Sequence, residues 1–267
     1  GAQTAGNSFQ NLADGFNKYF GLITAATATL TGLIMGFRKV IDIANEFGAS
    51  VANLSALTGL VGDDLQWLAD QAKKVALEGT DAGIKVTAGA QAIVDAYTLM
   101  GSAKPELLKN KEALDLVTQS ALTLAEAARM KATDAVESLA LTMNQFSAPA
   151  KEAARYINVL AAGSKEGAAE VPQIAASMVK FGAASAAANI SIEESVGLIE
   201  TLAEKGLKGE RAGTQIKTAL LKMQIGADDT NPAIVGLQVA LDNLRAKGLT
   251  AAEMVNFFGL ESYVAAE

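Results

Sequence analysis

The chain places its hydrophobic residues at helical spacing in a series of segments separated by glycine or polar turns. Between residues 134 and 146 apolar residues recur at i, i+3, i+4, i+7 and i+10, and the same spacing returns between residues 171 and 181. Further stripes lie in residues 112–128 and at Ile234, Leu237, Leu241 and Leu244. Each stripe predicts an amphipathic helix with one buried face, and no segment alternates like a strand over a useful length. We therefore predict an all-α fold, an array of short amphipathic antiparallel helices joined by Gly or polar turns.

Separate signals predict where these helices begin and end. The S/T-x-x-E spacing of a capping box occurs twice, and a looser version once, at Ser191–Glu194, Thr250–Glu253 and Asp63–Gln66. Pro105 and Pro149 are expected in first helical turns. Glycines that follow apolar runs are expected to end helices, at positions 59, 101, 163, 206, 226 and 248. Because the sequence has no exact repeat, a regular solenoid is compatible with it but is not demonstrated by it.

Residues 19–37 carry no charge and are numerous enough to span a bilayer. They include the pattern Gly32-x-x-x-Gly36, which is found in membrane helix dimers. Several Thr and Gly residues dilute the stretch, so we favour a buried helix packed through small residues and keep membrane contact as a hypothesis. The chain begins with Gly and no Met, and residues 264–267 show no helix-stop signal. Both features lead us to expect a piece of a longer protein.

Composition excludes several classes of function. The 267 residues are 50% hydrophobic but only 5% aromatic, and they include no His and no Cys. A Ser-His-Asp triad, a Cys-His pair, a histidine zinc site and a disulfide are therefore ruled out. The formal net charge of -7 argues against direct nucleic-acid binding, because phosphate contacts need an excess of Lys and Arg. We predict no enzymatic activity, no catalytic residue, no metal site and no cofactor.

Four short motifs invite a chemical interpretation, and each is better explained structurally. Residues 206–214 are rich in glycine but lack the Lys of a phosphate-binding loop, so a turn between helices is predicted. Residues 228–232 open like a calcium loop but lack its later Gly and Glu, which leaves a turn. The pairs Asp63–Asp64 and Glu193–Glu194 stand at predicted helix starts, where they suit the helix dipole. Trp67, the one Trp of the chain, fits a half-buried face.

Several segments together resemble the phage tail tape measure family. The most specific is residues 188–214, where order, spacing and the closing Ala-Gly-Thr agree with the family signature at Ser191, Glu194, Gly206, Gly209, Ala212, Gly213 and Thr214. Residues 54–68 and 215–223 resemble the family in a weaker way, and residues 229–244, with Phe258-Gly259-Leu260, are similar to versions from prophages. The likeness spans roughly residues 46–262, with a loose fit over residues 163–187 and none in the first 45.

The resemblance implies a structural protein that acts in tail length determination, tail assembly and DNA ejection. It implies as partners the tail tube protein, tail assembly chaperones and tail tip proteins, with self-association in the tail lumen. Host membrane contact through residues 19–37 would fit ejection. The implied locations are the lumen of the virion tail and, during assembly, the cytoplasm of the host bacterium.

Three regions are expected: a hydrophobic N-terminal helical segment (1–45), a tape-measure-like helical core (46–225) and a truncated C-terminal helical hairpin extension (226–267). Short helices punctuated by Gly predict that the core is a compact folded module and not an extended ruler. The alternative reading is a generic all-helical interaction scaffold or a secreted helical toxin component.

Overall fold

The computed structural model describes residues 42–250 and 253 of the chain. The chain divides into two compact units, Gly1–Ala49 and Ser50–Glu267. Of the first unit, residues 42–49 are described, and they are helical. The hydrophobic stretch at residues 19–37, and with it the membrane hypothesis, lies outside the described residues. The predicted region boundaries near residues 45 and 225 stay predictions.

The described part of the second unit consists of helices and connecting turns, without a strand, which confirms the all-α prediction. A first helix runs to residue 58. The labelled elements that follow are α2 (Gly62–Glu78), α3 (Ala90–Ala103), η1 (Pro105–Lys109), α4 (Lys111–Ala128), α5 (Ala132–Gln145), η2 (Ala150–Glu152), α6 (Ala153–Glu166), α7 (Val171–Ala187), α8 (Ile192–Glu204), α9 (Gly209–Gln224), η3 (Asp228–Thr230), α10 (Pro232–Val235) and α11 (Leu237–Ala246).

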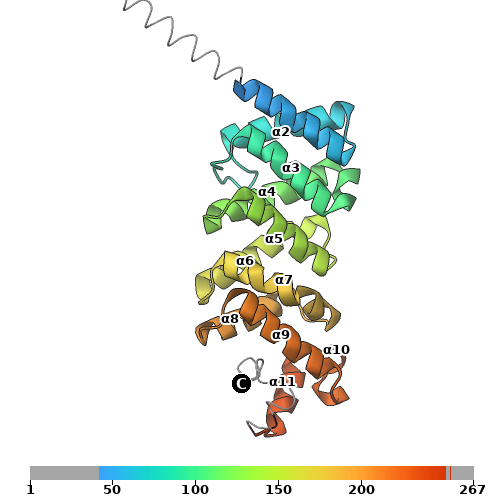
Figure 1. Cartoon of the computed structure of the whole chain (residues 1–267), viewed down its shortest axis with the longest axis vertical. Helices are drawn as coiled ribbons and strands as arrows, with labels where there is room; N and C mark the ends of the chain where they lie inside the picture. The colour runs from blue at the N-terminus through green and yellow to red at the C-terminus, as the bar shows by residue number, and fades with distance from the viewer. Residues whose placement is uncertain (1–41, 251–252, 254–267) are drawn as a thin grey trace, which may run out of the picture. The chain divides into compact units, whose positions relative to one another are not determined.

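These helices form two rows, which we call the even row (α2, α4, α6, α8) and the odd row (α3, α5, α7, α9). Each helix contacts both its neighbour along the chain and the next helix but one, as in the pairs α6·α8 and α7·α9. Figure 1 shows the helices following one another in chain order from α2 to α9. Helices that pair with the next but one build a helical solenoid, the arrangement that the sequence left open.

Polar contacts reveal the repeat length of this solenoid. Several hydrogen bonds between successive repeats join residues 38 to 40 positions apart. The Lys104 ammonium, for example, donates to the Asn144 side-chain oxygen at 3.1 Å, and the Gln224 amide donates to the Ala184 carbonyl at 3.3 Å. One even and one odd helix therefore make a repeat of ~40 residues, the length typical of two-helix repeat proteins.

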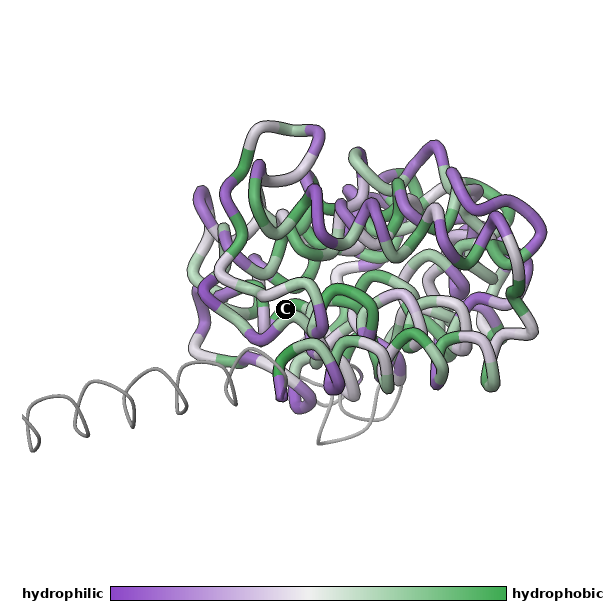
Figure 2. The backbone as a smooth tube through the Cα atoms, turned by 90° about the horizontal axis from the view of Figure 1, so that it is seen from above, coloured by the Kyte–Doolittle hydropathy of each residue, from purple (hydrophilic) through white to green (hydrophobic). Residues whose placement is uncertain are grey.

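The core lies between the rows and is made by the predicted stripes. Leu114, Val136, Met143, Met178 and Phe181 are all buried. Along the tube in Figure 2, hydrophobic and hydrophilic stretches alternate within the helices, as amphipathic helices require. Ala supplies much of the remaining buried surface, so neighbouring helices can approach closely.

Three expectations about boundaries are wrong. The stripe from Ile234 to Leu244 is not one helix, because Gly236 takes φ +83° and separates α10 from α11, and Ile234 is exposed. The looser capping box is absent: α2 begins at Gly62 with no side-chain cap. Two of the predicted stop signals, Gly101 and Gly163, lie inside helices α3 and α6.

Both of those internal glycines serve close packing. A methyl group at Gly101 would lie 2.6 Å from a methyl carbon of Leu108, and one at Gly163 would collide with Val196. In a sequence, a glycine at a helix contact cannot be told from a glycine at a helix end. This explains why Gly101 and Gly163 were predicted to end helices.

Candidate functional site

The described residues contain no group of three or more Asp, Glu, His or Cys side chains that could hold a metal ion. Within the same part of the chain, no helix combines the length and the apolar character that a membrane span needs. The motif that the sequence marks as most specific, residues 188–214, is therefore the candidate site. It occupies α8, the turn that follows and the first half of α9.

The block opens with the predicted capping box, which the structure confirms. The Ser191 hydroxyl accepts from the backbone N–H of Glu194 at 3.2 Å, and the Glu194 carboxylate accepts from the Ser191 N–H at 2.8 Å. These reciprocal bonds satisfy donors that the first turn of α8 cannot pair internally. The next residue of this turn, Ser195, is buried and bonds Ser185 of α7 through the two hydroxyls at 2.5 Å. The start of α8 is thereby fixed on α7.

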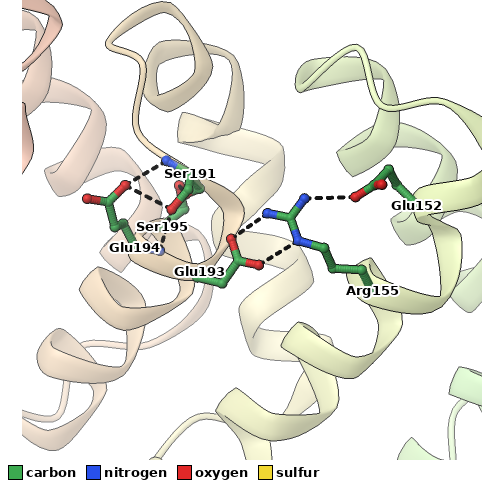
Figure 3. Close-up of polar contacts among 6 residues, drawn as sticks. All are labelled: Glu152, Arg155, Ser191, Glu193, Glu194 and Ser195. Carbon is green, nitrogen blue, oxygen red and sulfur yellow. Dashed lines mark hydrogen bonds and ion pairs between the residues drawn. The ribbon is translucent and has the colours of Figure 1, made fainter.

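The second carboxylate of the pair, Glu193, ties α8 to α6. Arg155 of α6 donates through Nε and Nη2 to the two carboxylate oxygens of Glu193 at 2.7 and 2.8 Å, and through Nη1 to Glu152 at 2.8 Å. Figure 3 shows the guanidinium held between the two carboxylates, beside the Ser191 capping box. These hydrogen bonds hold the pKa of Glu193 below its ordinary value. Glu194 thus completes the capping box of α8, and Glu193 forms an ion pair between α8 and α6.

The turn between α8 and α9 depends on two glycines. Gly206 has φ +84°, and its N–H donates to the Ala203 carbonyl while Leu207 N–H reaches back to Leu202 at 2.9 Å. This pattern closes a helix C-terminus and needs a residue that tolerates positive φ. Gly209 has φ +62° at the first position of α9. The two glycines therefore allow the chain to reverse over the four residues 205–208 between the helices.

The end of the motif lies where α9 meets α7. Ala212 and Gly213 are both buried. A methyl group at Gly213 would lie 2.8 Å from the Cα of Ser177 and closer still to its carbonyl oxygen. The Ser177 hydroxyl also donates to the Gly209 carbonyl at 2.7 Å. Two backbones in such contact leave no room for a side chain on α9.

The last motif residue, Thr214, has a different position. It is exposed, and its hydroxyl donates to the Glu210 carbonyl of the same helix at 2.8 Å. The turn predicted for residues 206–214 is shorter than expected, because α9 begins at Gly209 and Thr214 lies in its second turn. The structure therefore places Ser191 and Glu194 at the start of α8, Gly206 and Gly209 in the turn from α8 to α9, and Ala212 and Gly213 at the contact of α9 with α7, and it leaves Thr214 on the surface.

The sequence did not single out the partners of this motif. Ser177 of α7 and Arg155 of α6 sit 32 and 38 residues before the groups they bond. Glu200 of α8 accepts from the Ala169 N–H at 2.9 Å, and its carboxylate fills the space beside Gly163 and Gly167. These pairs are 31 to 38 positions apart, so no local pattern in the sequence marks them.

A second polar cluster is buried between α3 and α4. The Tyr97 hydroxyl donates to Asp115 at 2.5 Å, and the Gln119 amide donates to the other Asp115 oxygen at 2.8 Å. Gln119 also accepts from the Asp81 N–H at 2.7 Å, so the cluster holds the α2–α3 loop on α4. Burial raises the pKa of Asp115 and that of Tyr97. Asp115 accepts from Tyr97 and Gln119 of the same chain, and the cluster joins α3, α4 and the loop before α3, so we assign it to the fold.

The remaining motifs behave as turns and helix ends. Residues 228–230 form η3, Asn231 caps α10 by accepting from the Ala233 N–H at 3.0 Å, and Asp229 pairs with Lys247 at 2.9 Å. Asp64 pairs with Lys111 at 2.6 Å, and the Lys111 ammonium lies 5.6 Å from the centre of the half-buried Trp67 ring. Both acidic motifs are thus occupied by contacts within the chain.

Comparison with known proteins adds a family to this geometry. The family model described as phage-related minor tail protein matches residues 70–259. The tape measure protein of Pneumococcus phage Dp-1 is 26% identical to the chain over 204 residues. That match covers 76% of this chain but 16% of the phage protein, so the chain spans a small part of its relative's length. No solved structure shows a significant match.

Proposed function

Because this chain belongs to the family of phage-related minor tail proteins, we propose that it is a folded structural module of a tail tape measure protein. We propose that the module acts in tail assembly, and that tail length determination and DNA ejection are functions of the longer protein. The family makes the chain a structural protein of the phage tail. The proposal adds which part of that protein it is.

One observation carries the proposal. Apart from Thr214, the motif residues make helix ends or helix contacts, and the block from residue 188 to 214 fixes α8 and α9 on α6 and α7. A binding or catalytic motif would direct polar groups into a cleft, whereas the polar groups of this motif bond other residues of the chain. A motif of this kind supports a structural role for the module.

The folded state also supports a distinction within tape measure proteins. An extended helical ruler would add about 1.5 Å of length per residue. In this chain ~40 residues instead fold back as a helix pair and stack on the previous pair. We propose that this segment is a compact module and that other parts of the longer protein measure length.

The partners in this proposal are the tail tube protein, tail assembly chaperones, tail tip proteins and further copies in the tail lumen. The stretch at residues 19–37 would contact the host membrane during ejection. The module would be made in the bacterial cytoplasm and end in the virion tail. It would act without enzymatic activity and without a cofactor, as expected for a chain that lacks His and Cys.

An in-frame deletion of residues 50–249 from the gene that encodes the chain tests the tail function. We expect particles without tails, or tailed particles that fail to infect, and rescue when the intact gene is supplied from a plasmid. A deletion of residues 2–12, outside the matched segment, controls for disturbance of the gene. Normal infectious particles after the large deletion would overturn the proposal and favour a general interaction scaffold. Cell-wall clearing by the chain that a single acid-to-amide substitution abolishes would overturn the non-enzymatic part.

A further inference from the structure

Three exposed aliphatic residues recur about one repeat apart in the odd row. They are Leu141 of α5, Val179 of α7 and Leu221 of α9, which are 36%, 50% and 43% exposed. Each lies outside the buried stripe of its helix, and α5, α7 and α9 are successive neighbours in the stack (Figure 1). The outward surface of these three helices, which we call the odd face, therefore carries a row of apolar side chains.

The middle helix of the odd face, α7, exposes no charged side chain. Its exposed residues are Pro172, Val179, Ala183 and Ala187. The one charged residue of this helix, Lys180, is partly buried and pairs with Glu210 of α9 at 3.1 Å. Contiguous apolar surface of this kind is typical of a site that another protein covers.

Charges of opposite sign flank α7. On one side, the charged residues of α5 are Asp134 and Glu137, and both are exposed. On the other side, α9 exposes Arg211, Lys217 and Lys222, besides the Glu210 that Lys180 neutralises. Within residues 42–250 and 253, none of these five acidic and basic side chains forms an ion pair. The charges are therefore available to a partner.

The order acidic, apolar and basic makes the odd face complementary to itself. A two-fold axis along α7 lays α7 of one molecule on α7 of another, and it places α5 of each molecule over α9 of its partner. Acidic side chains then oppose basic ones in two equivalent contacts, and the row of apolar side chains is covered. An arrangement that laid α5 on α5 would instead oppose like charges.

We propose that the odd face is the contact between two copies of this chain, related by a two-fold axis along α7. Helices of 14 to 17 residues are about 20–25 Å long and pack about 8–10 Å apart, so three of them cover ~600 Å² on each copy. This area is small for a stable complex, and we therefore expect a dimer that forms at micromolar concentrations.

The proposal deepens the proposed function, and rests on it, in that it names the surface by which further copies of the chain meet. Its test uses the isolated chain and reads association alone. A chain that does not dimerise would therefore overturn this inference and leave the outcome of the tail deletion unaffected.

Sedimentation velocity of the full chain, from about 1 to about 200 µM in low salt, tests the proposal. We expect monomer to convert to dimer as concentration rises, with weaker association in 1 M NaCl. Val179→Glu brings two like charges together at the axis and should raise the dissociation constant more than about tenfold. Leu116→Glu, at an exposed leucine (45%) of α4 in the even row, should leave it unchanged.

Charge reversal gives a second readout that a loss of folding cannot imitate. Asp134→Lys with Glu137→Lys makes α5 basic, and Lys217→Glu with Lys222→Glu makes α9 acidic. Either pair alone opposes like charges across the contact and should raise the dissociation constant more than about tenfold. All four substitutions together restore opposite charges and should restore the dimer. Circular dichroism checks that each variant stays folded.

Four results would overturn the proposal. The parent chain could remain a monomer at every concentration, or it could associate beyond the dimer without limit, which would assign the contact to the ends of the solenoid. Val179→Glu and Leu116→Glu could affect association equally, which would assign it to another surface. The fourfold charge variant could stay as dissociated as either pair, which would refute the placement of α5 over α9.

Discussion

Replacement of Gly213 by alanine probes the closest helix contact of the motif. The added methyl carbon would lie 2.8 Å from Ser177 Cα and closer still to the Ser177 carbonyl oxygen. Both are backbone atoms of α7, so no side chain can move aside. The helices α7 and α9 must separate, and the bond from the Ser177 hydroxyl to the Gly209 carbonyl is lost or lengthened.

The size of the effect follows from two opposing terms. Forcing one extra carbon into a packed contact costs about 1–3 kcal/mol. Replacing Gly by Ala inside a helix recovers up to about 1 kcal/mol of helix propensity. We therefore expect Gly213→Ala to lower the free energy of unfolding by about 1–2 kcal/mol, with Gly213→Val worse.

Gly197→Ala is the matched control, because Gly197 also lies inside a helix, is exposed, and would place its methyl group in open space. We expect this variant to be slightly more stable than the parent. Urea unfolding followed by circular dichroism at 222 nm measures both. If the two alanine variants shift the midpoint in the same direction by similar amounts, the close approach of α7 and α9 is refuted.

Four further predictions follow from named contacts. Ser191→Ala should cost about 1 kcal/mol in urea unfolding through loss of the cap, with Ser191→Thr close to the parent. Tyr97→Phe should cost about 1–3 kcal/mol by the same measurement, because it removes a donor from buried Asp115. Arg155→Ala should lower the urea midpoint slightly at low salt and not at 1 M NaCl, since the ion pairs are partly exposed. Carboxyl NMR titration should find the pKa of Asp115 above and the pKa of Glu193 below the ordinary value, and equal pKa values for both would contradict the structure. The contribution of Glu193 to stability is present above its unfolded pKa and is lost as pH falls through its folded pKa. Acidification through the raised pKa of Asp115 instead favours the folded state.

The sequence predicted well what depends on local order. The stripe from Val171 to Phe181 became the buried face of α7, and the boxes at Ser191 and Thr250 formed as expected. These features depend on residues three or four positions apart, where helix geometry fixes the neighbours. The resemblance to the tape measure family also rested on a local motif, the block from Ser191 to Thr214. The match to the family model supports that resemblance.

What the sequence could not supply depends on residues more than 30 positions apart. Arg155 and Glu193, or Ser177 and Gly209, meet only because the repeats stack in one register. Gly163 and Gly206 look alike in the chain, yet one admits a neighbouring Val side chain and the other takes positive φ. Gly236 likewise interrupts the stripe from Ile234 to Leu244, although the hydrophobic residues of that stripe keep helical spacing in the sequence.

Tail length after removal of one solenoid repeat tests the central claim most directly. Deleting residues 152–190 in frame joins Lys151 to Ser191, so that α8 with its own cap takes the place of α6 in the even row. We expect tails of normal length in electron micrographs, because a folded module does not measure length. Tails uniformly shorter by about 60 Å, or ~1.5 Å for each deleted residue, would show that the segment is part of the extended ruler and would contradict the account.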